Sequence, residues 1–429
     1  MKALKGNIIF TASSEKFEVY ENSYLVESEG TVVGIFKELP SHLKGIEVDN
    51  FGDSLIIPGF VDMHLHAPQF QNMGLGLDEE LLQWLEKYTF PEEAKYSNEV
   101  YAKRLYTNLA KELWRNGTTR VSLFSTIHRN GTEILMDVFN RAGIGAYVGK
   151  VNMDRNSPDF YVESTEESLA STEEWILATK DKYNLVKPII TPRFVPSCSV
   201  KLMKGLAKLS EKYNLKVQSH LSENESEIQW VSELHPEFGS YADVYDGMKL
   251  LTENTIMTHA VHNTPEEIEL LAKRNVFIAH CPNANYNLSS GIMPARKFLD
   301  AGIRVGLGTD ISGGHQIGIY KVMDRAIQAS KINWLNSGKA ERCLTMPEAF
   351  YMGTKGGGEF FGKVGSFEDG YSLDALVIDD ENLGDRDFRS IEERLQRFIY
   401  CGDDRNITKR YVAGKLLSEP GAIHVASGM

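Results

Sequence analysis

Two histidines, His64 and His66, stand two residues apart at the end of an apolar segment that covers residues 60–66. Side chains at positions i and i+2 of a β-strand point to the same face, so a strand here would direct both imidazoles to one side. Two such imidazoles are half of a divalent metal site. A helix would place them on different faces, and two histidines that close a strand near the surface are the alternative. The metal interpretation depends on the rest of the chain.

Further residues that bind metals in proteins end other apolar segments. They are His220 at the end of residues 216–220, His259 at the end of residues 255–259 and Asp310 at the end of residues 303–310. Active sites of barrels built from strands and helices lie at the C-terminal ends of the strands, where these side chains would meet. Three neutral imidazoles and a carboxylate suit Zn²⁺, which lowers the pKa of a bound water to about 7. The segment ending at residues 191–194 offers no Lys, Glu or Cys to bridge a second ion, which favours one metal.

Glu223 lies three residues beyond His220. A turn of the chain would bring this carboxyl back over the metal, where it could pass a proton from water to a ring nitrogen and then to a leaving amine. The alternative is a solvated glutamate at the start of a helix, beside Glu225 and Glu227, because acidic first turns are common.

The elements that must position these residues alternate along the middle of the chain. The spacing of Leu, Trp and Tyr predicts helices over residues 79–87 and 98–116, and further helices over 202–213 and 265–274. Counting the strand before His64 gives about eight βα units, which predicts an α/β fold with a (β/α)8 TIM-type barrel over residues 58–370. The predicted strands cover residues 60–66, 119–124, 144–149, 186–192, 216–220, 255–259, 276–280 and 303–310.

Both ends of the chain are rich in β-branched and aromatic residues instead. The predicted strands are residues 7–11, 24–27 and 31–35 near the start, and 375–378, 397–400 and 408–415 near the end. Residues 1–57 and 371–429 are therefore expected to form one small β-sandwich domain.

Composition limits the classes of function. Lys and Arg number 46 against 59 Asp and Glu, and the net charge of −13 argues against a nucleic-acid partner. No apolar run approaches a membrane span, and the start of the chain lacks the apolar core of a signal peptide. The four cysteines are far apart without a CxxC pair, which favours a reduced, cytoplasmic setting.

The chain resembles the amidohydrolase superfamily of metal-dependent hydrolases. The motifs that carry the resemblance are residues 58–66, 219–223, 258–259, 280–283 and 308–310, which mark the branch of deaminases and chlorohydrolases. Residues 66–69, 84–91 and 192–194 resemble more narrowly the members that deaminate guanine. The resemblance runs from about residue 55 to the end of the chain, and it rests on matches of short motifs.

The resemblance implies a role for each matching residue. One Zn²⁺ per subunit would be held by His64, His66, His220 and Asp310, although Fe²⁺ or Mn²⁺ suits similar ligands. The catalytic residues would be Glu223, His259 and Asp310: Glu223 as the proton shuttle, with His259 hydrogen-bonding the attacking water rather than serving as a fourth imidazole ligand. The residues implied to bind substrate are His66, Ala67, Pro68, Gln69, Arg193, Phe194, His220, Glu223 and Asp310.

Gln69, Arg193 and Phe194 would hold a purine base. An amide can pair with a ring edge, a guanidinium can donate to the O6 carbonyl, and a phenyl ring can stack on the base. A loop-capping Gln, a surface Arg and a core Phe are the alternatives. Trp84 is expected either to pack or to line the pocket. His280 is expected beside the site, with Asn283 and Asn285 orienting it, and Ser312 and the two glycines after it either fix Asp310 or turn the chain. His42, His128, His235, His262, His315 and His424 are expected to be ordinary loop or surface residues.

The expected function is hydrolytic deamination of guanine to xanthine and ammonia in purine catabolism, with Glu223 protonating N3 during attack at C2. The expected assembly is a homodimer, the usual state of the family, with no nucleic acid or membrane as partner. A related amidohydrolase that deaminates or dechlorinates another heterocycle, such as a cytosine, an adenosine derivative or a triazine, is the alternative. An inactive relative that serves as a binding or assembly protein is a further one, but such a protein would be expected to have lost metal ligands.

Overall fold

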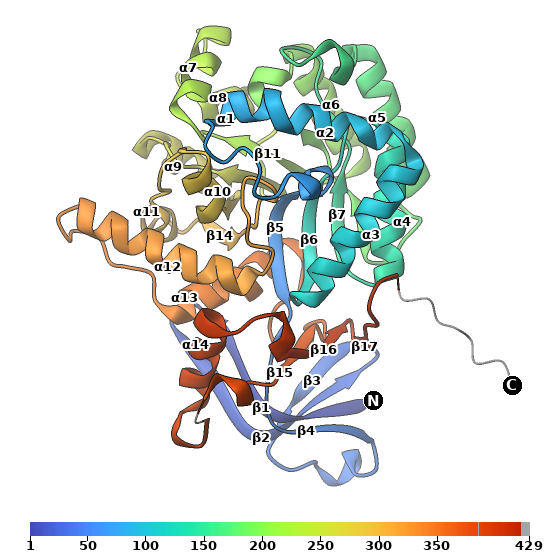
Figure 1. Cartoon of the computed structure of the whole chain (residues 1–429), viewed down its shortest axis with the longest axis vertical. Coiled ribbons are helices and arrows are strands. Elements are labelled where there is room, and N and C mark those ends of the chain that lie inside the picture. The colour runs from blue at the N-terminus through green and yellow to red at the C-terminus, as the bar shows by residue number, and fades with distance from the viewer. Residues whose placement is uncertain (385, 422–429) are drawn as a thin grey trace, which may run out of the picture.

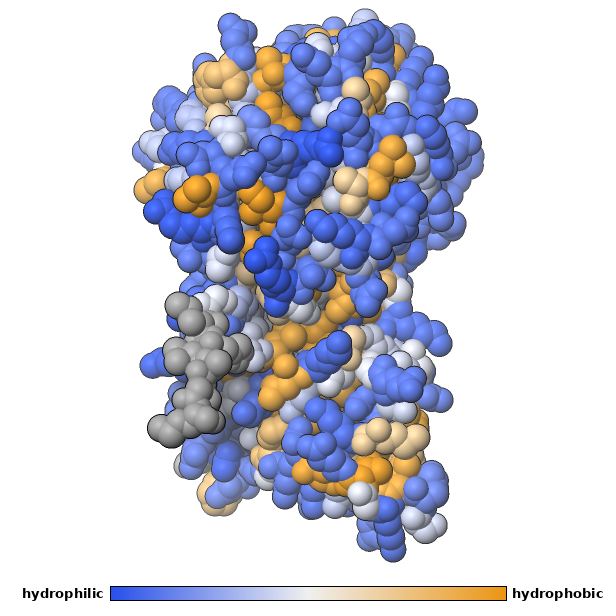
Figure 2. Space-filling model, turned by 90° about the vertical axis from the view of Figure 1, so that its right-hand side faces the viewer, coloured by the Kyte–Doolittle hydropathy of each residue, from blue (hydrophilic) through white to orange (hydrophobic). Residues whose placement is uncertain are grey.

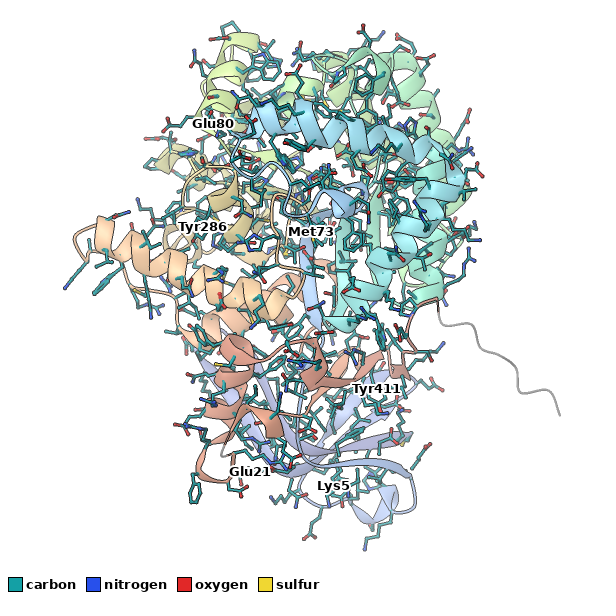
Figure 3. All side chains as sticks on the ribbon, viewed as in Figure 1. Lys5, Glu21, Met73, Glu80, Tyr286 and Tyr411 are labelled. Carbon is teal, nitrogen blue, oxygen red and sulfur yellow. The ribbon has the colours of Figure 1, made fainter. Side chains whose placement is uncertain are left out.

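The computed structural model describes residues 1–384 and 386–421 and has two lobes (Figure 1). In the upper lobe helices surround parallel strands, and the lower lobe holds strands from both ends of the chain. Figure 3 shows Met73, Glu80 and Tyr286 in the upper lobe and Lys5 and Tyr411 in the lower one. Within the described ranges, none of the helices has the length and apolar character that crossing a membrane requires. His424 and the last part of the predicted C-terminal segment lie outside the described residues.

Two four-stranded parallel sheets form the centre of the upper lobe, in the orders β5-β6-β7-β9 and β11-β12-β13-β14. Every residue of β5, β6, β11, β12 and β13 is buried. Strands of parallel sheets are covered on both faces, which explains their continuous apolar sequences. The predicted α/β class with parallel strands is confirmed. The strands are β5 (Phe60–His66), β6 (Thr118–Phe124), β7 (Gly145–Gly149), β9 (Val186–Pro188), β11 (Val217–Leu221), β12 (Thr255–His259), β13 (Phe277–His280) and β14 (Arg304–Leu307).

Backbone hydrogen bonds link the two sheets at both of their seams. The N–H of Gln218 donates to the carbonyl of Ile190 over 2.9 Å, and the N–H of Asp310 donates to the carbonyl of His64, also over 2.9 Å. The predicted strand over residues 186–192 is divided. Strand β9 ends at Pro188; the N–H of Ile189 still donates to the carbonyl of Val148 over 3.0 Å, but the N–H of Ile190 donates to the carbonyl of Lys216 on the opposite side. The second part of the predicted strand, β10 (Thr191–Pro192), pairs with β8 (Val151–Asn152).

Helices cover the parallel sheets. The prediction over residues 98–116 is confirmed by α3, where the side chain of Asn98 accepts from the N–H of Tyr101 and caps the first turn. The predicted helix over residues 79–87 is confirmed from Leu81 onward; it contains a π-helical turn (Leu85–Thr89) after α1 and continues beyond the predicted range as α2. The helices are α1 (Leu81–Trp84), α2 (Phe90–Glu93), α3 (Glu99–Arg115), α4 (Arg129–Ala142), α5 (Thr165–Thr179), α6 (Val200–Tyr213), α7 (Glu225–Leu234), α8 (Tyr241–Gly247), α9 (Pro265–Lys273), α10 (Pro282–Asn287), α11 (Ala295–Asp300), α12 (Ile319–Asn336), α13 (Met346–Tyr351) and α14 (Ile391–Cys401).

The lower lobe contains one seven-stranded sheet in the order β17-β16-β15-β4-β1-β2-β3. Strand β1 pairs antiparallel with β2 and parallel with β4. Strands from both ends of the chain therefore share one sheet. They are β1 (Lys2–Ser13), β2 (Lys16–Ser28), β3 (Thr31–Phe36), β4 (Glu47–Pro58), β15 (Ala375–Ile378), β16 (Ile407–Val412) and β17 (Lys415–Leu416).

The predicted strand over residues 397–400 is wrong, because these residues belong to α14. A capping box between Ser390 and Glu393 starts this helix, and Ile391, Leu395 and Phe398 are buried on one side of it. The aromatic and β-branched residues of this short segment resemble a strand, but the apolar spacing over the full eleven residues is helical.

A buried ion pair ties the lobes together. Arg120, on β6, donates from Nε to Oδ2 of Asp374 over 2.7 Å and from Nη2 to Oδ1 over 3.1 Å. Asp374 also accepts the N–H of Gly59, just before β5, at its backbone carbonyl. Figure 2 shows a largely hydrophilic surface on which hydrophobic side chains gather in the narrow region between the lobes. The lower lobe therefore fixes the start of β5, the strand that carries the first two histidines.

Candidate active site

His64 and His66 lie on the C-terminal part of β5, as predicted, and their rings are neighbours with centroids 5.0 Å apart. Gly308 gives them room. A Cβ at this position would lie 3.0 Å from Cβ of His64 and 2.8 Å from Sγ of Cys281. The glycine therefore allows the segment after β14 to pass close to β5, and this segment carries Asp310.

The prediction that Asp310 ends a strand is wrong, because β14 stops at Leu307. Asp310 instead lies in the following turn with a φ of 48°, a left-handed conformation that is uncommon for a residue other than glycine and that clusters at functional sites. Its Oδ1 is 3.2 Å from Nε2 of His64 and 3.7 Å from Nε2 of His66. The carboxylate thus reaches both histidines of β5.

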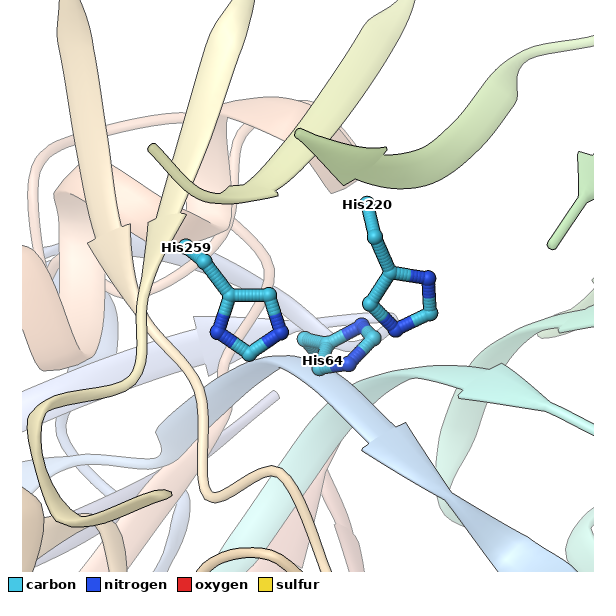
Figure 4. A group of neighbouring side chains, drawn as sticks. All are labelled: His64, His220 and His259. Atoms are coloured by element: carbon cyan, nitrogen blue, oxygen red, sulfur yellow. The ribbon is translucent and has the colours of Figure 1, made fainter. Parts of the chain in front are cut away.

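Rings from β11 and β12 complete the cluster (Figure 4). Candidate ligand atoms of His64, His220 and His259 all lie within 4.8 Å of one another, and so do those of His64, His66 and Asp310. The Nε2 atoms of His66 and His220 are 3.0 Å apart. Five side chains from four segments of the chain therefore converge on one point.

The chemistry of this cluster fits a divalent metal ion. All four imidazoles are buried, and the contact of Nε2 of His64 with Oδ1 of Asp310, at 3.2 Å, does not have the geometry of a hydrogen bond. Burial lowers the pKa of His64, and lowers the pKa of His66 and His220 well below the usual value, which favours the neutral rings that metals bind. Neutral imidazoles facing a carboxylate form a donor set that suits zinc.

The outer nitrogens of three of these rings have partners. Nδ1 of His220 donates to the carbonyl of Arg193 over 2.6 Å. Nδ1 of His64 lies 3.1 Å from Oγ1 of Thr258, and Nδ1 of His259 lies 2.9 Å from Oδ1 of Asn285. A partner on Nδ1 fixes the orientation of each ring. In His64 and His220 it directs Nε2 toward the centre of the cluster, and in His259 it directs Nε2 toward Glu223, whose Oε2 is 3.3 Å away.

Glu223 lies between β11 and α7 and is 4% exposed, so it is not the solvated glutamate of the alternative. Its Oε2 is 3.3 Å from Nε2 of His259, and its Oε1 accepts from Oγ of Ser290 over 3.1 Å. Burial, with a smaller contribution from the charge of Asp310, raises the pKa of Glu223 to about 8. A carboxyl with such a pKa can both hold and release a proton near neutrality.

One cavity joins the metal cluster to the predicted base-binding residues. It is lined by His66, Gln69, Leu81, Trp84, Leu85, Arg193, Phe194, His220, Glu223, Glu227, His259, Leu288 and Asp310. Trp84 lines this cavity and also packs in a buried apolar cluster with Leu81 and Leu85, while its Nε1 donates to the carbonyl of Leu75. Ala67 and Pro68 are buried in the turn after β5 and are not part of its lining in the described structure.

Glu93, the last residue of α2, connects Gln69 to Arg193. Its Oε1 accepts from Nε2 of Gln69 over 2.7 Å, and its Oε2 accepts from Nη1 of Arg193 over 2.7 Å. The guanidinium of Arg193 also lies 5.0 Å from the ring centroid of Phe90. Sequence analysis missed Glu93 because its partners are 24 and 100 residues away in the chain.

Several other expectations need correction. Asn285 binds His259 rather than His280, and Asn283 accepts the backbone N–H of His315. For Ser312 and the two glycines after it, the second expectation is the one observed: the N–H of Gly314 donates to the backbone carbonyl of Asp310 and the chain turns here, while the N–H of Ser312 donates to Oε1 of Gln69 over 3.3 Å. His235 is 3% exposed, so it is not a surface residue.

Comparison with protein families places the chain among known proteins. Residues 55–417 match the model of the amidohydrolase family. A guanine deaminase of Dictyostelium discoideum is 40% identical over 96% of this chain and 97% of its own length, and a probable guanine deaminase of Schizosaccharomyces pombe is 44% identical over 96% and 82%.

Comparison with solved structures also finds a guanine deaminase. The structure of guanine deaminase from C. acetobutylicum, with guanine bound in the active site, superimposes with a TM-score of 0.95 at 55% identity, covering 97% of this chain and all of that one. An adenosine deaminase from Xanthomonas campestris with bound zinc shares the fold, with a TM-score of 0.81 at 22% identity over 98% and 93% of the two chains.

Proposed function

The chain belongs to the amidohydrolase family, within the group of guanine deaminases, and from this premise we propose that it hydrolyses guanine to xanthine and ammonia. The observation that carries the proposal is the single cavity, in which the metal-type cluster and the pair Gln69 and Arg193 face the same space. A flat base held by Gln69 and Arg193 would present one edge to the metal-type cluster.

The metal would be one Zn²⁺, held by His64, His66, His220 and Asp310. Such an ion lowers the pKa of a bound water to about 7 and so makes a nucleophile available near neutrality. The donor set supports zinc, and Fe²⁺ is the second candidate. His259 is assigned a different role, because Asn285 aims its Nε2 toward Glu223 at 3.3 Å.

The side chains around the cavity divide the proton transfers. Glu223, held by Ser290, takes the first proton of the water and delivers it to N3 as the water oxygen adds to C2 of guanine. His259 hydrogen-bonds the incoming water. Asp310, whose Oδ2 lies 3.8 Å from the same Nε2 of His259 that faces Glu223, accepts the second proton of the water. That proton passes to the amino group, the C2–N bond breaks and ammonia leaves.

The base would be held by contacts of three kinds. Arg193 donates to the O6 carbonyl, Gln69 pairs with the ring edge, and Phe194 covers a face of the base. Their common lining of the cavity supports this assignment. Ala67 and Pro68 would contribute through the backbone turn that sets Gln69.

The decisive experiment measures ammonia release by the purified, metal-analysed protein with guanine, adenine, cytosine and aminotriazines. Release from guanine alone is expected. If a metal-replete sample releases ammonia only from another heterocycle, that heterocycle replaces guanine as the proposed substrate. If it releases ammonia from none of them, the result favours the inactive relative.

We also propose the finer architecture. The hydrogen bonds at both seams support one closed (β/α)8 barrel over residues 58–370. The register shifts within β1 and the apolar cluster around Leu4, Ile8 and Phe10 support a lower sheet that folds over itself as a β-sandwich of residues 1–57 and 371–429. The homodimer and the cytoplasmic setting stay predictions.

A further inference from the structure

The carboxylate of Glu93 is wholly buried, and it bridges the two polar side chains assigned to the base. We propose that Glu93 is a specificity-determining positioning residue: it fixes the hydrogen-bonding direction of Gln69 and neutralises Arg193, so that the pocket selects neutral purine bases over anionic ones. This inference rests on the proposed function, which it deepens.

Two neighbours fix the orientation of the Gln69 amide. A carboxylate accepts hydrogen bonds only, so the amide group of Gln69 must turn its NH₂ toward Oε1 of Glu93. A backbone N–H donates only, so the Ser312 N–H meets Oε1 of Gln69 on the other side. One N–H and one lone pair of the amide remain for a ligand. Glu93 and Ser312 together decide which edge of a base Gln69 can read.

Glu93 also balances the charge of Arg193. The Arg193 side chain is 3% exposed, and Glu93 is its one carboxylate partner within 4 Å among the described residues. A guanidinium has five N–H donors, of which the contact with Glu93 uses one on Nη1. The pair has no net charge, so Arg193 offers directional donors to a carbonyl without the attraction that an unpaired buried cation has for an anion.

Helix α2 directs the carboxylates of Glu92 and Glu93 to different surroundings. Glu92, the preceding residue, turns the other way: its carboxylate accepts from Nζ of Lys95 and from the hydroxyl of Tyr101, each over 2.5 Å. Glu93 points inward, where Arg193 lies over the ring of Phe90. Two adjacent, buried glutamates of one short helix therefore have separate environments, and Glu92 provides a matched control.

The test compares Glu93→Gln with Glu92→Gln. Guanine kinetics and zinc content are measured, together with competitive inhibition by urate, an anionic oxopurine at neutral pH, and by hypoxanthine, a neutral one. For Glu93→Gln we expect KM for guanine to rise about tenfold or more, with a smaller change in kcat and unchanged zinc. We also expect affinity for urate relative to hypoxanthine to rise about tenfold, because Arg193 is left unpaired. Glu92→Gln is expected to match the wild type in all four measurements.

A second variant separates charge from packing. In the double variant Glu93→Gln with Arg193→Gln both charges are absent, so the preference for urate should return to the wild-type value although guanine binding stays weak. Glu93→Asp keeps the charge on a shorter stem, so it should raise KM without any gain for urate. These variants also carry the test if Glu93→Gln does not fold.

The inference is overturned if Glu93→Gln weakens guanine, urate and hypoxanthine by the same factor, or if its kinetics match those of Glu92→Gln. A failure of the proposed function looks different, because the wild-type protein would then release no ammonia from guanine. In that case the relative affinities for urate and hypoxanthine, measured by direct binding, still decide whether Glu93 controls the charge of the pocket.

Discussion

The cavity has two corners that are built in different ways. The metal corner, His64, His66, His220 and Asp310, takes three of its four residues directly from strands β5 and β11. The base corner, Gln69, Glu93 and Arg193, takes its residues from a 3-10 turn, a four-residue helix and the segment just after β10. Backbone ladders fix the first corner, whereas the second depends on hydrogen bonds between side chains. The first corner should therefore tolerate changes around it better than the second.

Arg193 belongs to both corners. Its backbone carbonyl accepts from Nδ1 of His220, and its guanidinium pairs with Glu93. The backbone contact does not depend on the side chain, so changes of the Arg193 side chain should leave His220 in place. This predicts that variants of the two corners separate cleanly: those of the metal corner lose metal, and those of the base corner lose guanine affinity while they keep the metal.

His220→Ala tests the metal corner with the largest expected effect. Removing one ligand should lower zinc content and reduce kcat/KM by more than about a thousandfold, as measured by metal analysis and ammonia release. His42→Ala, which changes an exposed histidine of the lower lobe, is the control. A His220→Ala protein that keeps stoichiometric zinc and activity would remove His220 from the ligand set.

Glu223→Gln changes the chemistry without changing either corner. The amide preserves the shape of the buried side chain but cannot carry the proton, so zinc should be retained while kcat falls about 10²- to 10⁴-fold. Glu225→Gln, two residues later at the start of α7, should have no effect because Glu225 is exposed. Near-normal turnover in Glu223→Gln would contradict the role of proton shuttle.

Gln69→Ala tests the base corner. The variant would lose the proposed hydrogen bond to guanine, and it leaves Oε1 of Glu93 without its partner, so kcat/KM for guanine should fall about 10- to 100-fold with zinc unchanged. Gln71→Ala, at an exposed position of the same turn, is the control. Unchanged guanine kinetics would remove the narrow assignment to guanine while leaving the hydrolase assignment intact.

The two corners also differ in how far the sequence predicts them. A histidine at the end of an apolar segment is visible without a structure, because strand periodicity and the common edge of parallel strands imply its direction. The predicted strand before Asp310 still ends three residues too late, because a turn with a positive φ has no comparable periodicity. The small β elements at both ends were also visible, but α14 shows that four residues of β-type composition do not decide a strand.

The base corner could not be assembled in the same way. Gln69, Glu93 and Arg193 come from three irregular or short elements, and no spacing rule joins residues that are 24 and 100 positions apart. The resemblance supplied Gln69 and Arg193, whereas Glu93 follows only from the side-chain contacts. Thr258 likewise gives no sign in the sequence that it orients the ring of His64. Asn285 was expected to orient a histidine, but the side-chain contacts show that this histidine is His259 and not His280.

Thr258→Val is the subtlest test, because it asks whether the metal corner depends on side chains as well as on strands. Valine keeps the volume of the buried residue but removes the hydroxyl that lies 3.1 Å from Nδ1 of His64. Outer contacts of this kind typically contribute about 10- to 100-fold to metal affinity. Because β5 still fixes the backbone of His64, we expect the metal affinity of Thr258→Val to fall by about tenfold, as measured by competition with a chelator. Thr119→Val, whose buried hydroxyl lies 3.3 Å from the carbonyl of Phe60 at the other end of the strands, should leave metal affinity unchanged. A loss in Thr258→Val as large as that in His220→Ala would mean that the metal corner relies on side-chain contacts no less than the base corner does.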